Sequence, residues 1–262
     1  MIPLHFIEEW EALAPWSGRA MVEQDLIICR AVVEIYSEPL LAGALAFRGG
    51  TALHKLHLAP ASRYSEDIDL VQVSSGPIGP VFDALRDRLQ PWLGKPKREF
   101  GPGVVTMIFK MTSEGPPPEP MRLKIEINSR EHFAELGLER RPFAVESRWF
   151  QGTCEVSTYA LDEMLGSKLR ALYQRRKGRD LFDLWLGLTR GGASPERIIP
   201  CFRRFMEASG CTVSAAEFRQ NLERKLGERL FRDDLGPLLR PDVGYDVETA
   251  GRLVLDELVG RL

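Results

Sequence analysis

Two aspartates at alternate positions, Asp67 and Asp69, are the first residues in this sequence whose types and spacing could do chemistry. They lie in the alternating stretch 67–73, which predicts a β-strand, so both carboxylates project from the same face. Paired carboxylates suit Mg²⁺, which takes few oxygen ligands from protein and completes its shell with water and substrate phosphates. Taken alone, the same pattern also fits a strand whose polar face meets solvent.

A glycine pair, Gly49 and Gly50, precedes the aspartates, and sixteen residues separate Gly50 from Asp67. The pair follows a short apolar run, 45–47, that predicts a buried strand, and it precedes 51–58, which predicts a short helix. Glycines at such a turn let backbone N–H groups approach a phosphate closely. Together with the aspartates, the turn predicts a nucleoside-triphosphate site without a Walker sequence, with Mg²⁺ or Mn²⁺ as the metal.

A third carboxylate, Glu126, lies in the strand-like run 121–128. Its neighbours at 125 and 127 are apolar and belong to the opposite face, so Glu126 shares a face with Lys124 and Asn128. A third carboxylate near an Asp-x-Asp strand completes the ligand set that is usual in two-metal sites. Plain amphipathic alternation, with Glu126 and Lys124 meeting solvent, is the other interpretation of this strand.

The segment 161–190 carries seven basic and four acidic residues. Its densest basic cluster, called here the basic loop, consists of Arg175, Arg176, Lys177 and Arg179. The basic loop could bind a triphosphate or an RNA backbone. It is also consistent with an ordinary connection between helices, after which Asp180 and Asp183 face together at i, i+3.

The elements expected around these residues change character near residue 160. The first part mixes both patterns, with helices predicted at 20–38 and 81–93 and strands at 104–111, 121–128, 142–150 and 154–158. The second part is helical, with helices predicted at 161–175, 179–189, 195–208, 214–226 and 246–260. We therefore predict an α+β fold with an α/β domain over 1–160 and a helical domain over 161–262.

The composition is that of an ordinary globular chain, with 44% hydrophobic and 27% charged residues over 262 positions and a net charge of −2. It excludes wholesale disorder, and the whole-chain charge does not bear on nucleic-acid binding. Four scattered cysteines without a C-x-x-C pair argue against a zinc site and suit a reducing compartment. The first residues show no basic n-region and no long apolar h-region, and no window approaches ~18 uninterrupted apolar residues. We expect a cytoplasmic protein without a membrane partner.

In their order along the chain, these motifs resemble the AbiEii/AbiGii nucleotidyltransferase toxin family, which includes the MenT toxins of bacterial toxin–antitoxin pairs. The resemblance covers about residues 40–190. It is carried by Phe47-Arg48-Gly49-Gly50-Thr51, Arg63-Tyr64-Ser65-Glu66-Asp67-Ile68-Asp69-Leu70, the Lys-Ile-Glu strand and the segment 167–184. It implies a polymerase-β-like nucleotidyltransferase core with a mixed sheet, followed by a helical half that completes the active site.

In the first half, the resemblance assigns roles to residues of two motifs. Gly49, Gly50 and Thr51 match the turn that holds the phosphates of the incoming nucleotide. Asp67 and Asp69 match the metal-binding pair.

The resemblance assigns further roles outside the glycine turn and the aspartate pair. Lys168 matches the family lysine that contacts the triphosphate, and Asp180 and Asp183 match the acidic positions of the last motif. Ser65 matches a position near the nucleotide that carries a phosphorylatable serine in some relatives.

The resulting hypothesis is metal-assisted nucleotidyl transfer. Asp67 and Asp69 hold the metal against a nucleoside triphosphate, a hydroxyl attacks the α-phosphorus, and pyrophosphate leaves. Positive charges at Lys168, Arg179 and Arg48 would offset the charge on the leaving group. By resemblance, the acceptor is an RNA 3′ end, tRNA above all, contacted by the basic loop, and a cognate antitoxin is the protein partner.

Two other functions use the same residues differently. One is nucleotidylylation of a protein or of a small molecule such as an antibiotic, in which only the acceptor groove differs. The other is a non-catalytic binding module of the same fold, for instance for an antitoxin. The intact carboxylates and Lys168 argue against the binding module.

Overall fold

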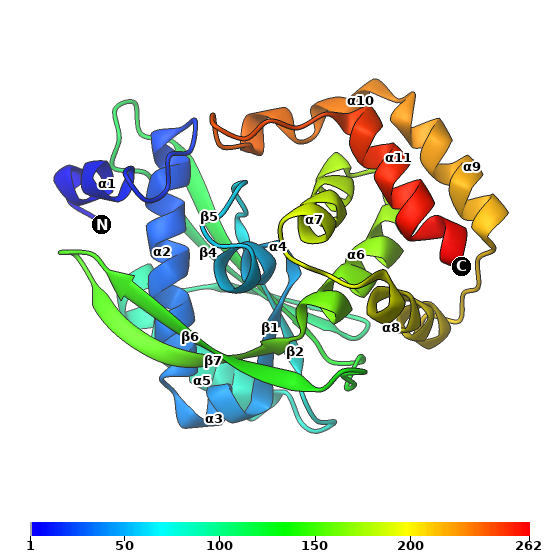
Figure 1. Cartoon of the computed structure of the whole chain (residues 1–262). Helices are drawn as coiled ribbons and strands as arrows, with labels where there is room; N and C mark the ends of the chain where they lie inside the picture. Colours follow the sequence, from blue (N-terminus) through cyan, green and yellow to red (C-terminus); the bar gives the residue numbers. More distant parts are fainter. Residues whose placement is uncertain (1) are drawn as a thin grey trace. The chain divides into compact units, whose positions relative to one another are not determined.

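A computed structural model describes residues 2–262, and their contacts divide them into two compact units (Figure 1). Unit 1 comprises the described residues up to Phe133 together with Leu138–Thr158. Unit 2 comprises Ala134–Gly137 and Tyr159–Leu262. The chain therefore passes from one unit to the other three times. That the units are separate domains divided at residue 160 stays a prediction.

Seven described strands of unit 1 form one mixed sheet in the order β3-β4-β5-β2-β1-β7-β6. Strand β2 pairs antiparallel with β1 and parallel with β5, so the two strands beside the aspartates run in opposite directions. The strands are β1 (Leu45–Arg48), β2 (Asp67–Gln72), β3 (Lys97–Gly101), β4 (Val104–Thr112), β5 (Pro120–Asn128), β6 (Leu138–Glu146) and β7 (Gln151–Tyr159). The mixed sheet confirms the predicted α+β class.

Helices α2 and α5 pack on this sheet, α2 against β5 and α5 against β4. Apolar side chains of β4 and β5 are buried on one side of the sheet, and Met107, Phe109 and Ile125 are fully buried. Because side chains alternate along a strand, the polar residues between them gather on the other face. The helices of unit 1 are α1 (Leu4–Trp10), α2 (Arg19–Tyr36), α3 (Pro39–Ala44), α4 (Gly49–Ala52), the π-helical turn η1 (Leu53–His57) and α5 (Gly79–Leu93).

Some elements differ from the sequence-based expectations. The helix expected over 51–58 begins at Gly49 and changes from α to π geometry at Leu53. The strand expected over 142–150 is β6, which begins earlier and ends at Glu146. Strand β3 and helices α1 and α3 were not predicted. All five residues of β3 are exposed, so it has no apolar alternation, and the two helices are too short to show a helical period.

Unit 2 is helical. Helix α6 packs against α7 and α8, and α11 contacts α7 and α9 (Figure 1). A Cβ atom at Gly166 would lie 2.7 Å from Cys201 Cβ, so this glycine allows the close approach of α6 and α8. The elements are α6 (Leu161–Gln174), α7 (Gly178–Thr189), α8 (Pro195–Ala208), α9 (Ala215–Leu226), α10 (Arg229–Asp233), η2 (Gly236–Leu238), α11 (Val247–Glu257) and η3 (Val259–Arg261). Helix α10, with five residues, was not predicted.

A buried glutamate at the start of α6 explains why four residues from the first half of the chain belong to unit 2. Glu163 is fully buried, and its two carboxylate oxygens accept the backbone N–H groups of Glu135 at 2.7 Å and Leu136 at 2.9 Å. Burial raises the pKa of Glu163, and the two N–H donors oppose the rise. The segment 134–137 is therefore hydrogen-bonded to α6 through the side chain of Glu163.

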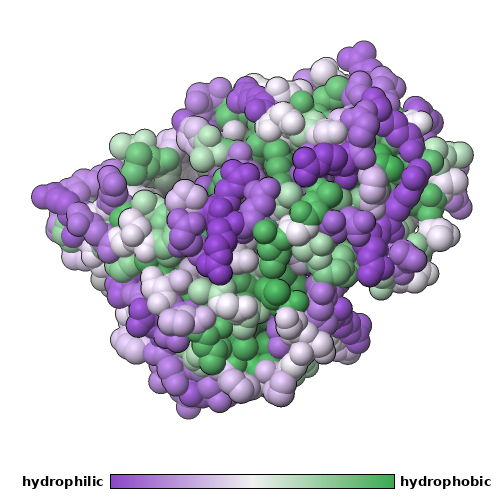
Figure 2. All heavy atoms as spheres, turned by 60° about the horizontal axis from the view of Figure 1, so that its bottom comes forward, coloured by the Kyte–Doolittle hydropathy of each residue, from purple (hydrophilic) through white to green (hydrophobic). Residues whose placement is uncertain are grey.

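Hydrophobic side chains on the surface are mixed with hydrophilic ones on the face that Figure 2 shows. The large apolar residues that are exposed are Leu13, Leu40, Phe100, Leu138 and Leu230. None of the described helices combines the length and the hydrophobicity that a membrane crossing requires.

Candidate functional site

The candidate residues fall into two groups, one in each unit. In unit 1, the strand register brings the carboxylates together. Asp67 is the register partner of Lys124, and Asp69 is the partner of both Glu126 on β5 and Arg48 on β1. Register partners share a face, so all five side chains lie on one side of the sheet. Asp67 and Asp69 share this face, as their spacing predicts, and the pairing of β2 with β5 adds Glu126 to it.

The glycine turn lies directly against the aspartate strand. Gly49 has φ +79°, in the left-handed region that favours glycine, and a Cβ atom there would lie 2.0 Å from Asp69 Oδ2. A Cβ atom at Gly50 would lie 2.6 Å from Arg63 Nη2 and 3.0 Å from Ser65 Oγ. Glycine is therefore required at position 49, a side chain at position 50 would displace the Arg63 guanidinium, and the turn has bare backbone beside the Asp69 carboxylate.

Two hydroxyl groups connect the turn to the start of β2. Thr51 Oγ1 lies 2.5 Å from the Asp67 carbonyl oxygen and 2.9 Å from Ser65 Oγ. A carbonyl can only accept, so Thr51 donates to Asp67 and accepts from Ser65. Thr51 is 1% exposed. Its hydroxyl holds the turn and the strand together, and the contacts with phosphate that the resemblance implies for this residue stay a prediction.

Lys124 lies between two carboxylates of this face. Its Nζ atom is 2.7 Å from Glu126 Oε2 and 3.3 Å from Asp67 Oδ2. Partial burial raises the pKa of Asp67 to about 6, an effect that Lys124 opposes and the negative charge of Asp69 reinforces. The sequence placed Lys124 on this face but assigned it no role. A divalent cation bound at this face would offset the negative charge of its carboxylates.

The donor chemistry fits a metal shared with substrate better than a metal held by protein alone. Among the described residues, no group of three or more His, Cys, Asp or Glu side chains could hold a metal ion. Mg²⁺ is commonly held by one or two carboxylates together with substrate phosphates. Asp67 and Asp69 fit that requirement, and Lys124 lies closer to Glu126, at 2.7 Å, than to Asp67, at 3.3 Å. The metal-binding roles of all three stay predictions.

Arg48 is held by an acidic residue that the sequence analysis missed. Its Nη1 atom lies 2.5 Å from Glu131 Oε2. Asn128 donates to the same oxygen at 3.3 Å and accepts the Glu131 backbone N–H at 3.0 Å. Arg48 and Glu131 are 83 residues apart, so no local pattern could have revealed this pair.

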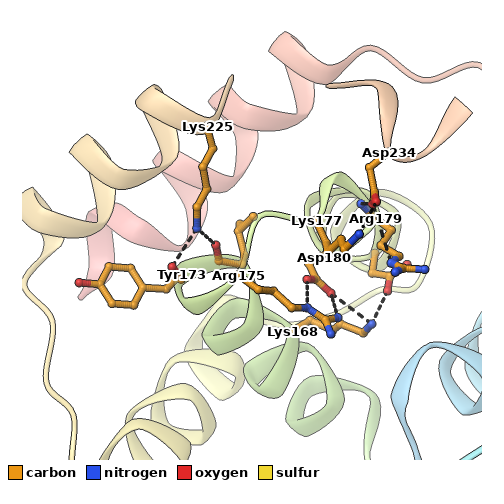
Figure 3. Close-up of polar contacts among 10 residues, drawn as sticks. Lys168, Tyr173, Arg175, Lys177, Arg179, Asp180, Lys225 and Asp234 are labelled. Atoms are coloured by element: carbon orange, nitrogen blue, oxygen red, sulfur yellow. Dashed lines mark hydrogen bonds and ion pairs between the residues drawn. The ribbon is translucent and has the colours of Figure 1, made fainter. Parts of the chain in front are cut away.

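In unit 2, Lys168, Asp180 and Asp183 come together as a buried charge cluster (Figure 3). The Lys168 Nζ atom lies 2.8 Å from Asp183 Oδ2 and 3.4 Å from Asp180 Oδ1. Arg175 donates two hydrogen bonds to the Asp180 carboxylate, from Nε at 2.6 Å and from Nη2 at 2.7 Å. Both aspartates are 0% exposed, and Lys168 is 6% exposed. Two cations and two anions therefore compensate one another, as buried charges must. The contact of Lys168 with a triphosphate stays a prediction.

The other cations of the basic loop also lie beside acidic groups. Lys177 Nζ is 3.2 Å from Asp234 Oδ1, and the Arg179 backbone N–H donates to Asp234 Oδ2 at 3.3 Å (Figure 3). Arg176 Nη1 lies 3.6 Å from Glu228 Oε2. These acidic partners follow the loop by about fifty residues and were missed by the sequence analysis. The positive charges of the basic loop are therefore balanced by neighbouring acidic groups. Contacts between this loop and RNA stay a prediction.

A buried lysine next to this cluster was also missed. Lys225 of α9 is 2% exposed, and its Nζ atom donates to the backbone carbonyls of Leu172 and Tyr173 at the end of α6 (Figure 3). Burial lowers the pKa of Lys225 to about 8. The residue satisfies carbonyl groups that a helix end leaves without partners.

A mixed sheet with a glycine turn packed on an Asp-x-Asp strand, followed by a helical unit, is the arrangement expected of a nucleotidyltransferase. The family model for the nucleotidyl transferase AbiEii toxin of type IV toxin–antitoxin systems matches residues 30–251. The chain belongs to this family of nucleotidyltransferase enzymes, which confirms the resemblance drawn from the motifs. No curated protein matches the sequence.

A solved structure with a TM-score above 0.5 shows the same fold. MenT4, a nucleotidyltransferase toxin from Mycobacterium tuberculosis H37Rv, superposes with a TM-score of 0.69 at 16% identity, covering 100% of this chain and 91% of that one. An antigenic nucleotidyltransferase-like protein from Paracoccidioides brasiliensis gives a TM-score of 0.39 at 17% identity, covering 77% and 88%. The first match agrees with the predicted nucleotidyltransferase core and helical second half.

Proposed function

We propose that this protein transfers a nucleotide from a nucleoside triphosphate to the 3′ end of an RNA, with tRNA as the acceptor, and acts as the toxin of a toxin–antitoxin pair. The observation that carries the proposal is the packing of the Gly49 backbone against Asp69 on the strand face that also holds Asp67. Membership of the family supplies the reaction class. The RNA acceptor and the antitoxin partner rest on the resemblance between the motifs.

Asp67 and Asp69 would hold Mg²⁺ or Mn²⁺, which supplies charge neutralisation at the phosphates of the nucleotide. Gly49 and Gly50 give the phosphates close access to the backbone, because neither residue has a side chain and Asp69 leaves no space for one at position 49. The proton of the attacking hydroxyl passes to Asp69 or Glu126, the two adjacent carboxylates of the register.

Lys168 is proposed as a nucleotide-binding residue of unit 2. Asp183 holds its ammonium at 2.8 Å, which fixes the position of the charge before a ligand arrives. We expect Lys168→Ala to weaken nucleotide affinity, measured by isothermal titration with each nucleoside triphosphate in Mg²⁺. Unaltered affinity would remove Lys168 from the proposed site.

The decisive experiment incubates the protein with Mg²⁺, each labelled nucleoside triphosphate in turn and total tRNA. Asp67→Ala is the test variant, and Asp87→Ala is the matched control, because Asp87 is an exposed carboxylate of α5 in the same unit. We expect label in tRNA with the wild type and the control, and none with Asp67→Ala. The folded fraction should be the same in all three, since Asp67 is a partly buried carboxylate whose raised pKa shows that its charged form is disfavoured.

The other outcomes separate the alternatives. Label found on protein instead of tRNA would shift the acceptor to protein, and equal labelling by Asp67→Ala would contradict the aspartate assignment. Chelation by EDTA should stop the transfer, and restoration by Mg²⁺ or Mn²⁺ should recover it. Full activity after chelation would contradict the metal-dependent mechanism.

A further inference from the structure

Two cationic side chains face each other across the β4–β5 ladder without a counterion. Lys110 and Arg122 are register partners, and both are exposed. Within residues 2–262, neither side chain makes a hydrogen bond or an ion pair. Like charges placed directly opposite each other destabilise a sheet. The pair therefore does not contribute to the stability of the fold.

The cation pair lies on the same face of the sheet as the aspartates. Arg122 is two residues before Lys124 on β5, and Lys124 is the register partner of Asp67. At ~3.3 Å per residue, the pair lies ~7 Å along the strand from the Asp67 row. The face thus has a negative end, where Asp69 and Glu126 are neighbours, and a positive end at Lys110 and Arg122.

Lys110 and Arg122 also line a groove of unit 1, together with Met21 and Gln24 of α2. Its volume is about 470 Å³, and its lining includes Lys110, Arg122, Tyr64 and Glu66. Glu66 directly precedes Asp67 in the chain. The cation pair therefore borders a hollow that begins beside the proposed metal-binding strand.

The contrast with the basic loop favours the cation pair as a surface for a polyanion. Arg175 lies 2.6 Å from Asp180 and Lys177 lies 3.2 Å from Asp234, so these cations already have anionic partners. A phosphate binding there would compete with a carboxylate. At Lys110 and Arg122, a phosphate would instead relieve repulsion between two cations.

We propose that Lys110 and Arg122 bind backbone phosphates of the acceptor RNA close to the end that receives the nucleotide. Charge complementarity selects a polyanion, and the fork of an arginine matches a phosphate group. The position on the Asp67 face places a bound strand beside the metal-binding carboxylates. The proposal rests on the proposed function, because it assigns the surface that holds the acceptor of that reaction.

The test measures the affinity of total tRNA for the full chain by filter binding at several salt concentrations. The variant is the double substitution K110E/R122E. The matched control is K95E/R140E, which changes the charge of unit 1 equally at two exposed positions, neither of which forms a side-chain hydrogen bond or ion pair within the described chain. We expect affinity to fall at least tenfold in K110E/R122E and less than twofold in the control. The slope of log affinity against log salt should decrease by about 1.5 for two lost phosphate contacts. An equal loss in the control would overturn the proposal.

A neutral variant separates binding from folding. K110Q/R122Q removes the repulsion between the cations, so its melting temperature should be equal to or above that of the wild type while its tRNA affinity falls. Wild-type affinity in this variant would contradict the proposal. The KM for the nucleoside triphosphate should stay unchanged, and a raised KM for the nucleotide with unchanged tRNA affinity would assign the pair to the nucleotide instead. Because tRNA binding is measured without turnover, this result is independent of whether Asp67→Ala abolishes transfer.

Discussion

Gly49 combines a left-handed backbone with a neighbour that leaves no space for a side chain. Its φ is +79°, and the Asp69 carboxylate occupies the place of a Cβ atom. Thr51 then fastens the same turn to the carbonyl of Asp67. The position of the aspartate pair relative to the turn therefore depends on these two contacts. A substitution at Gly49 would displace the backbone even if it left the charge of the site unchanged.

We expect Gly49→Ala to abolish transfer and to lower the free energy of unfolding by about 2 kcal/mol or more, since the left-handed backbone alone costs about 1–2 kcal/mol. Gly43→Ala is the control, because Gly43 lies in α3 with nothing within 4 Å of a Cβ atom. It should keep full activity and stability. Urea unfolding and the tRNA labelling assay measure both effects, and an active Gly49→Ala enzyme would contradict the role of the turn.

Glu23 gives the protein a stability that depends on pH. The residue is 1% exposed on α2, and burial raises its pKa to about 7 from an ordinary value of 4.5. Between pH 4.5 and 7, the folded chain keeps a proton that the unfolded chain releases, so stability falls as the pH rises through this window. Glu23→Gln removes the titration while keeping an acceptor for the Glu114 backbone N–H.

The stability of Glu23→Gln relative to the wild type should therefore increase by about 3 kcal/mol between pH 4.5 and 7, and this difference should stay constant above pH 7. Urea unfolding at a series of pH values measures the difference. A constant difference across the window would show that Glu23 titrates alike in the folded and unfolded chains.

At the scale of elements, α6 and α7 are joined by charges rather than by apolar contacts alone. Lys168 comes from α6, Asp180 and Asp183 come from α7, and Arg175 lies at the end of α6. Because both aspartates are fully buried, removing a cation leaves a buried anion less compensated. We therefore expect Arg175 to contribute to the packing of α7 on α6.

We expect Arg175→Ala to destabilise the protein by about 1–3 kcal/mol, because the carboxylate of Asp180 loses its two charge-assisted bonds. Arg176→Ala is the control in the same loop. Arg176 is exposed and lies 3.6 Å from Glu228, so its loss should cost less than about 1 kcal/mol. Thermal unfolding measures the loss of stability in both variants. Equal losses would show that the bonds from Arg175 to Asp180 do not stabilise the protein.

At the scale of the whole molecule, the chain passes between the units three times because four residues, Ala134–Gly137, belong to unit 2. Glu163 holds this segment through the N–H groups of Glu135 and Leu136. The attachment is a pair of hydrogen bonds to one buried carboxylate. One side chain thus determines how a segment from the first half of the chain joins the helical unit.

Glu163→Ala should increase hydrogen exchange at the amides of Glu135 and Leu136 by at least tenfold, since both lose their acceptor. Glu163→Gln retains one acceptor oxygen and should protect one of the two amides. Amides in β4, far from Glu163 in the chain, should exchange as in the wild type. Unchanged exchange at 135 and 136 in Glu163→Ala would show that other contacts hold the segment.

The sequence by itself determined what depends on local geometry. Alternation places Asp67 and Asp69 on one face of a strand, periodicity marks α2, α5 and most helices of unit 2, and Gly49-Gly50 marks the turn. These features follow from the two-residue period of strands and the 3.6-residue period of helices. The exposed edge strand β3 and the short helices carry no such period, and they were not predicted.

Only the tertiary structure decided which distant residues meet. The parallel pairing of β2 with β5 puts Lys124 between Asp67 and Glu126 and sets the cation pair of Lys110 and Arg122 on the same face. The tertiary structure also gives Arg48 its partner Glu131, and the packing within unit 2 provides the basic loop with acidic neighbours. Ion pairs between residues fifty or more positions apart leave no periodic signal, because they depend on strand register and helix packing rather than on spacing along the chain.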